Sequence, residues 1–331
     1  MHPHLPHIAR DLVLACYYFV KPAIPEGIRF LLRHWYALPV KWLVASSWPI
    51  RSASARTPQG WPGWPAGKSF AFVLTHDVET AKGLSRCRAL AELEMRLGFR
   101  SAFNFVPEGD YETPDDLRTF LTANGFEVGV HDLHHDGTLY RSFRSFKKRA
   151  SRINHYLRTW NASGFRSGFM RHNLRWLQHL DVEYDASTFE FDPFEPQPDG
   201  TGTIFPFWVY RDDGSAYVEL PYTVPQDSTL FLVLRESGND IWKQKVDWVA
   251  SRGGMALLIV HPDYMSFDGP QGPNEYRPEL YEDFLEYVRS RYGDKAWFAR
   301  PRDVAAFVRQ SMPRVPPPAA PATATRAQTV V

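Results

Sequence analysis

The chain has 331 residues, of which 44% are hydrophobic and 15% aromatic, and its formal net charge is +1. This length suits two domains or one α/β barrel, and the near-neutral charge argues against a nucleic-acid partner. Only two cysteines occur, Cys16 and Cys87, which argues against a disulfide framework and a thiolate metal site.

The first 60 residues form a basic, aromatic-rich extension. They contain seven Lys or Arg against two acids, and apolar residues are interleaved with these charges, as in "IRFLLRHWYALPVKWLV" (28–44). Such a stretch can lie on an anionic membrane surface or pack on the main domain as a helical hairpin. No segment has the length of a membrane span or the pattern of a signal peptide. We therefore expect a cytoplasmic protein, with residues 1–60 as the candidate for peripheral membrane contact.

Strand and helix patterns alternate through a core expected to span residues 68–312. The Pro- and Gly-rich segment 57–68 predicts a linker before it, and the Pro- and Ala-rich segment 313–331 predicts a disordered tail. Strands are expected at 70–74, 101–106, 126–130, near 165, 182–186, 255–260 and 296–299, with a β-rich stretch at 203–224. Helices are expected at 84–97, 114–124 (capped by Thr113), 141–160, 173–180, 240–252, 277–292 and 301–311. This alternation is typical of a parallel sheet, open or closed into a barrel.

Ionisable residues follow five of the predicted strands. They are His76, Asp77 and Glu79 after the first strand, "HDLHHDG" (131–137) after 126–130, Arg166, Asp185, and His261 in "HPDY" (261–264). Active residues of α/β folds gather at the carboxyl ends of the strands, so these groups predict one common site.

The spacing of these groups suits a divalent metal. Asp77 and Glu79 lie on one side of an extended chain, roughly 6.6 Å apart, and would repel unless a cation or a shared proton intervenes. His131 and His135 have the i, i+4 spacing of helical zinc pairs; His134 is the alternative ligand if the segment is irregular. Two imidazoles and one carboxylate form the donor set of a catalytic metal site.

Ordinary structural roles are the alternative for each group. An isolated H-x-x-x-H is commonly solvated, and strand-end acids often cap the following helix. Arg166 can be a salt-bridge partner and Asp185 a turn former. The coincidence of five strand ends favours the common site.

The order of these segments resembles that of the polysaccharide deacetylases, carbohydrate esterase family 4, with its NodB-homology fold. The resemblance spans roughly residues 68–311 and implies a distorted (β/α) barrel of seven or eight strands. It rests on "LTHDVE" (74–79), "HDLHH" (131–135), "FRSGF" (165–169), "YDAST" (184–188), "ELPYTVPQD" (219–227) and "IVHPDY" (259–264).

The resemblance also implies roles for individual residues. Asp77 is the expected general base and Arg166 orients it, while His261 is the general acid. Glu79, His131 and His135 are the expected ligands of a divalent metal, zinc by preference. Val78 stands where the family usually has a second Asp, so Asp77 is the alternative ligand.

The family's usual fourth motif is missing, which leaves Asp185 and Asp227 as candidate partners of His261. Tyr264 and Trp208 are candidates for stacking on sugar rings. His76 occupies the family's Phe position and has no predicted chemical role.

The implied function is a metal-dependent hydrolase that removes an N-acetyl or related acyl group from a glycan or a glycan precursor. An acetylated carbohydrate is then the partner, and a cytoplasmic site favours a nucleotide-linked or lipid-linked precursor. Two alternatives are a metal-free hydrolase of a small cyclic amide on the same fold and a non-catalytic carbohydrate-binding protein.

Overall fold

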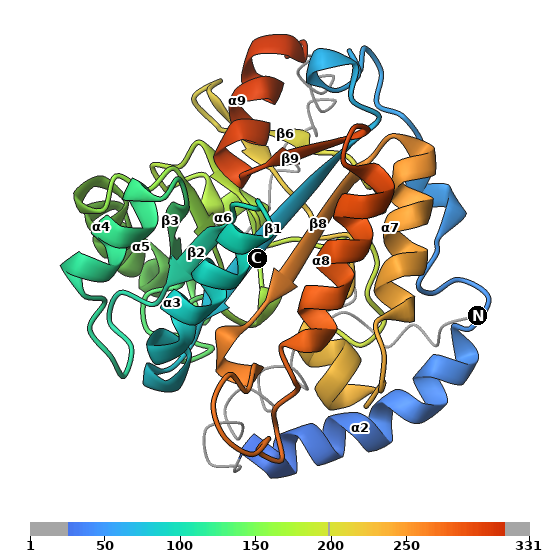
Figure 1. Cartoon of the computed structure of the whole chain (residues 1–331). Coiled ribbons are helices and arrows are strands. Elements are labelled where there is room, and N and C mark those ends of the chain that lie inside the picture. The colour runs from blue at the N-terminus through green and yellow to red at the C-terminus, as the bar shows by residue number, and fades with distance from the viewer. Residues whose placement is uncertain (1–25, 198, 315–331) are drawn as a thin grey trace, which may run out of the picture.

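Strand β1 (Phe70–Val78) is the centre of the computed structural model, which describes residues 26–197 and 199–314 (Figure 1). All nine residues of β1 are buried, because the strand pairs on both edges. On one edge it runs parallel to β8 (Met255–Val260). On the other edge its first half pairs with β9 (Ala296–Ala299) and its second half with β2 (Ala102–Phe105). A continuous apolar run is the pattern expected of such a fully enclosed parallel strand.

The sheet has nine strands in the order β6-β7-β5-β4-β3-β2-β1-β8, with β9 added on β1. The remaining strands are β3 (Glu127–His131), β4 (Gly164–Arg166), β5 (Tyr184–Asp185), β6 (Phe207–Tyr210) and β7 (Ala216–Glu219). All pairs are parallel except β6 with β7. The chain after β7 then reaches β8, where the amides of Thr223 and Val224 donate to Leu257 O. The curled sheet is therefore closed by irregular chain rather than by a strand pair.

Helices surround the sheet, with α3, α4 and α5 on one flank and α7 and α8 on the other (Figure 1). Their bounds are α3 (Ala81–Arg96), α4 (Asp115–Ala123), α5 (Phe143–Thr159), α6 (Leu174–Leu177), α7 (Asp240–Arg252), α8 (Glu279–Tyr292) and α9 (Pro301–Ser311). For α7 and β8 the bounds equal those predicted from the sequence. The predicted Thr113 cap of α4 is wrong: Pro114 has an extended backbone and occupies the N-cap, so the helix begins at Asp115.

The segment 57–68 is not the free linker that its Pro and Gly content predicted. Trp64 is buried and its indole Nε1 donates to Gly253 O at 2.8 Å. The rings of Trp61 and Trp64 lie edge to face, 4.7 Å apart. Aromatic burial therefore fixes this segment on the barrel.

Helix α2 (Glu26–Leu43) lies below the carboxyl ends of β1 and β8, on the opposite side of the molecule from α9 (Figure 1). It packs on the π-helical segment Ser228–Val233. Within the described residues no helix is long and apolar enough to cross a membrane. The predicted extension before residue 26, with Cys16, and the predicted tail from residue 315 lie outside the described residues.

His76 belongs to a buried polar network under the site. Its Nε2 lies 2.8 Å from Glu94 Oε1, and its Nδ1 lies 3.3 Å from Val260 O. Glu94 also accepts hydrogen bonds from the hydroxyls of Ser101 at 2.6 Å and Tyr281 at 2.5 Å. This network ties β1, α3 and α8 together, which explains the buried histidine in β1.

Replacing Glu94 with Ala is expected to lower the free energy of unfolding by about 2–4 kcal/mol, because three buried partners lose their acceptor. Urea denaturation measures the change. Glu92→Ala, an exposed position on the same helix, is the matched control and is expected to change stability by less than about 0.5 kcal/mol. Equal losses in both variants would contradict the structural role of Glu94.

Candidate active site

A cavity of about 280 Å³ opens at the carboxyl ends of the strands. Its polar wall contains Asp77, Glu79, His131, His135 and His261. Arg29, Phe30 and Arg33 of helix α2 line another part of the cavity. Five of the residues predicted from strand ends thus line one cavity.

Strand register brings the polar groups together. Asp77 lies opposite Asn104 in the β1–β2 pair, and His131 lies opposite Arg166 in the β3–β4 pair. His261 directly follows the last residue of β8. Because all these strands are parallel, side chains distant in the sequence reach the same edge of the sheet.

Asp77 is buried and held from two sides. The Asn104 Nδ2 donates to its Oδ1 at 3.0 Å, and Arg166 Nη1 lies 3.4 Å from both of its carboxylate oxygens. Arg166 is itself fully buried and also donates to Thr75 Oγ1 at 2.9 Å. Burial raises the pKa of Asp77, but Arg166 and then His131 outweigh it and lower the pKa below its ordinary value. Asp77 is therefore an oriented, ionised carboxylate suited to accept a proton.

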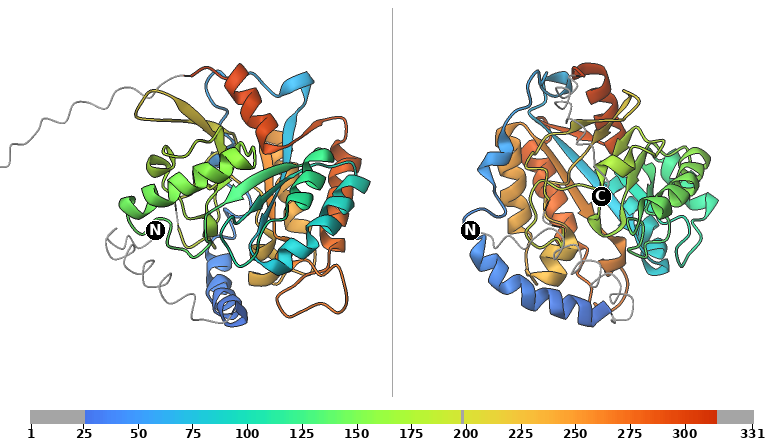
Figure 2. Two further views of the ribbon diagram at one scale, coloured as in Figure 1. Left: turned by 90° about the vertical axis from the view of Figure 1, so that its left-hand side faces the viewer. Right: turned by 180° about the vertical axis from the view of Figure 1, so that it is seen from behind.

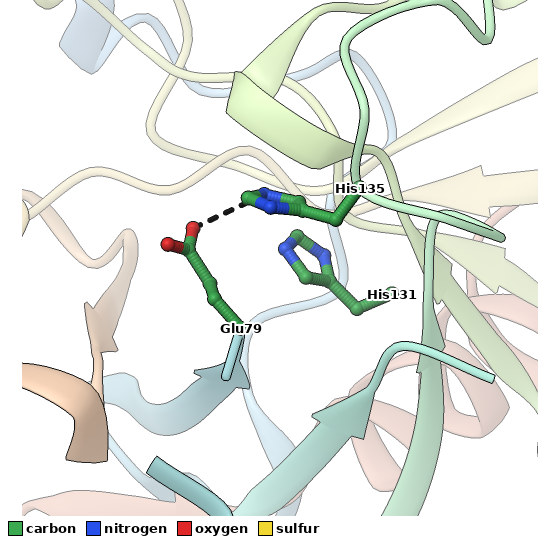
Figure 3. A group of neighbouring side chains, drawn as sticks. All are labelled: Glu79, His131 and His135. Carbon is green, nitrogen blue, oxygen red and sulfur yellow. Dashed lines mark ion pairs between the residues drawn. The ribbon is translucent and has the colours of Figure 1, made fainter. Parts of the chain in front are cut away.

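Glu79, His131 and His135 form the candidate metal centre (Figure 3). One ligand atom from each lies within 4.8 Å of the others, and Glu79 Oε1 is 3.2 Å from His135 Nε2. This is the one cluster of three potential ligands among the described residues, and it does not include Asp77. The structure thus groups Glu79 rather than Asp77 with the two histidines.

The predicted helix behind the H-x-x-x-H spacing is wrong. His131 is the last residue of β3, and the chain then turns through left-handed backbone at Asp132 (φ 56°) and His135 (φ 52°). His134, the alternative ligand, instead places its Nδ1 3.0 Å from Glu108 O. Gly168 packs against the turn so closely that an added Cβ would lie 2.7 Å from the His135 ring. An irregular turn, rather than a helical face, brings the imidazoles together.

The donor set fits a divalent cation. His131 Nδ1 lies 3.2 Å from Arg166 O, which leaves Nε2 as the ligand atom, and this buried Nε2 has no hydrogen-bond partner among the described residues. Burial lowers the pKa of His131 to about 4, so its ring is neutral at pH 7. Burial raises the pKa of Glu79, but His135 reverses this and holds it well below its ordinary value. Two imidazoles and one carboxylate suit zinc and similar metals.

His261 is paired with Asp227 rather than with Asp185. Its Nδ1 lies 2.6 Å from Asp227 Oδ1, and its backbone amide donates to Oδ2 at 2.7 Å. The Tyr276 hydroxyl also donates to Oδ2, at 3.0 Å. Burial lowers the pKa of His261, but Asp227 and then Glu79 raise it to about 10. His261 is therefore a protonated imidazolium whose Nε2 can donate a proton.

Asp185 and Trp208 lie outside the cavity, and these two predictions are wrong. Asp185 accepts hydrogen bonds from the amide and hydroxyl of Ser187, and as the last residue of β5 it lies between β4 and β7, opposite the buried Glu219. Trp208 lies on β6, where Arg314 stacks on its ring. Tyr264 does line the cavity, and its hydroxyl donates to Glu79 Oε2 at 3.2 Å.

Sequence reasoning missed two supporting residues, Asn104 and Asp263. Asn104 is a single polar residue inside an apolar strand, which is the signal that could have identified it. Asp263 accepts hydrogen bonds from the amides of Glu79 and Thr80, so it fixes the backbone that carries the glutamate ligand. Gly83 makes room for Asp263, because an added Cβ would lie 2.2 Å from its Oδ2.

No family model matches the chain, and no curated protein matches it in sequence. Several solved structures resemble it in fold, including the following two. One, assigned as a polysaccharide deacetylase from Mycobacterium smegmatis, is 17% identical with a TM-score of 0.59 over 77% of this chain and 95% of that one. The other, the Puue allantoinase, is 15% identical with a TM-score of 0.60 over 81% and 100%.

The chain has the fold of the polysaccharide deacetylases. The predicted distorted α/β barrel is therefore confirmed. The main order of the sheet has eight strands, in agreement with the predicted seven or eight, and β9 pairs with the first half of β1 outside that order.

Replacing His131 with Ala is expected to weaken Zn²⁺ binding by more than roughly 100-fold, since even residues that only support a metal ligand change affinity 10–100-fold. Isothermal titration of the metal-free protein measures the affinity. His134→Ala is the matched control, because His134 is adjacent but lies outside the ligand cluster. Equal affinity in the two variants would exclude His131 as a ligand.

Proposed function

We propose that this protein is a metal-dependent hydrolase that removes an acetyl group from the amide nitrogen of an acylated sugar. The observation that carries this proposal is the arrangement around one small cavity. The ionised Asp77, the Glu79–His131–His135 cluster and the protonated His261 all face the same space. Amide hydrolysis needs these three functions: a base, an electrophilic centre and an acid.

The protein's own residues would supply the proton transfers. As water attacks the amide carbonyl carbon, Asp77 takes its proton, while Arg166 and Asn104 keep the carboxylate in place. The C–N bond then breaks, and the departing nitrogen takes a proton from His261 Nε2. Acetate and a free amine are the products. Asp227 holds the imidazole through Nδ1 and favours its charged form before that transfer.

A metal held by Glu79, His131 and His135, with zinc as the proposed ion, would supply Lewis-acid polarisation of the carbonyl and activation of water. Tyr264 would support this centre by holding the Glu79 carboxylate through its hydroxyl. A cytoplasmic location is also part of the proposal.

A small cyclic amide is the second candidate substrate. The similarity of fold to an allantoinase and the modest cavity of about 280 Å³ both favour it over a long polymer. In this alternative the protein would hydrolyse the cyclic amide without a metal. Simple carbohydrate binding is less well supported, because binding alone does not require an ionised carboxylate and a protonated imidazole at one cavity.

Acetate release from N-acetylated sugars tests the proposal directly. We expect turnover in the wild type, loss of turnover with a chelator, and recovery when Zn²⁺ is returned. Asp77→Asn is expected to lower kcat by about 10²–10⁴-fold, the usual contribution of a positioned base, while its Zn²⁺ affinity stays close to wild type. Chelator-resistant hydrolysis of allantoin, without acetate release from any sugar, would replace this proposal with the cyclic-amide alternative.

Asp227→Asn keeps the size of the side chain but removes the charge next to His261. We expect kcat to fall by roughly 10²-fold or more, since the imidazole loses the partner that orients it and favours its protonated form. Zn²⁺ affinity and the urea midpoint, measured alongside, show whether the metal centre and the fold are intact. Full activity in this variant would remove His261 from the role of acid.

A further inference from the structure

Helix α2 has an apolar side that faces away from the barrel. Eight of its large hydrophobic residues are exposed: Ile28, Leu31, Leu32, Trp35, Tyr36, Leu38, Trp42 and Leu43. Trp35 is 64% exposed and Trp42 is 80% exposed. Their spacing of three and four residues places them on one side of the helix. Elsewhere in the described chain, Phe143 is the only exposed residue of this kind.

The other side of α2 is fixed to the protein. Phe30 is buried and its ring lies edge to face with Tyr264, 5.7 Å away. His34 Nδ1 lies 2.7 Å from Val233 O, and Lys41 forms an ion pair with Glu236. These contacts hold the helix in place while its outward side stays exposed. Figure 2 shows α2 (blue) along the lower rim of the molecule in both views.

A helix that is apolar on both sides needs a second apolar environment. The described part of α2 does not have the length and hydropathy of a membrane span, so the suitable environment is the surface layer of a bilayer, with the helix lying in its plane. Trp and Tyr prefer this layer, because their rings are apolar and carry one polar group.

The charges of α2 favour an anionic bilayer. Lys41 is already paired with Glu236, so the half-buried Arg29 and Arg33 are the basic side chains that remain for lipid headgroups, and the only acid of the helix is Glu26 at its first residue. Basic side chains near an anionic lipid surface each contribute about 1 kcal/mol of attraction. A protein partner would need a matching acidic and apolar groove, whereas a bilayer with anionic lipids presents both features on any flat surface.

We propose that α2 docks this protein on an anionic membrane surface and thereby faces the catalytic cavity toward lipid-anchored substrate. The same helix that exposes Trp35 and Trp42 contributes Arg29, Phe30 and Arg33 to the cavity wall. Docking therefore brings the cavity wall next to the lipid headgroups.

The substrate class follows from the same wall and rests on the proposed function. Arg29 Nε is buried and has no hydrogen-bond partner among the described residues. Guanidinium groups match the geometry of phosphate oxygens. An acylated sugar joined to a lipid through a phosphate would place its anionic linker at Arg29 and Arg33 and its acyl group deeper in the cavity.

Co-sedimentation of the full chain with vesicles tests the docking. Vesicles of phosphatidylglycerol and phosphatidylcholine are expected to bind the wild type, and vesicles of phosphatidylcholine alone are expected to bind it less. Trp35→Glu/Trp42→Glu is expected to weaken binding by roughly tenfold or more, because two interfacial rings are replaced by charges that the surface repels. Phe143→Glu, the matched exposed position on α5, is expected to bind like the wild type.

Three results would overturn the docking: a wild type that stays in solution, equal binding by the tryptophan variant, or loss of binding in Phe143→Glu as well. A dimer that dissociates in the tryptophan variant, without vesicle binding, would assign the apolar side to a second copy of the chain.

Acetate release separates this inference from the proposed function. With a water-soluble N-acetyl sugar, the tryptophan variant is expected to match the wild type. With an N-acetyl sugar phosphate carried on a vesicle lipid, it is expected to be slower by about the factor lost in binding. Vesicle binding without any acetate release would keep the docking and reject the function. Acetate release from the soluble sugar without vesicle binding would keep the proposed function and reject the docking.

Discussion

Compensation of buried negative charge at the end of β1 is the constraint on which the site depends. Asp77 is buried near the end of β1 and Glu79 is half-buried directly after it, and an unpaired buried carboxylate costs several kcal/mol. Arg166 and Asn104 compensate the first carboxylate, and His135 and Tyr264 contact the second. These partners come from different parallel strands and their loops, so the sheet must close around β1 before the charges are satisfied. The arrangement that makes burial tolerable also orients the base.

The sequence predicted the elements and most of the site, because both follow local rules. A buried parallel strand is a continuous apolar run, so the bounds of β8 could be read directly, and the left-handed Gly253 marks the end of α7. The convergence of Asp77, His131 and His261 follows from the rule that strand ends meet at one edge. Neither inference requires knowledge of the loops.

The errors concern residues whose position depends on loops. His131 and His135 were paired for the wrong reason, because left-handed backbone at Asp132 and His135 replaces the expected helix. The choice between Asp185 and Asp227 was open, since Asp227 follows the irregular chain that closes the barrel at β8. The position of a site residue could be predicted where a strand carries it, and it stayed ambiguous where a loop carries it.

Helix α2 shows why composition alone could not decide between a packed helix and a membrane-surface helix. One side of α2 packs on the barrel and the other exposes aromatic rings, so the same sequence pattern is compatible with both descriptions. The packed side also reaches the candidate metal centre: Phe30 contacts Tyr264, and the Tyr264 hydroxyl donates to Glu79. A shift of α2 would therefore change both the cavity wall and a hydrogen bond to a candidate metal ligand. The proposed docking of α2 on a membrane would therefore affect the geometry of the cavity as well as the location of the protein.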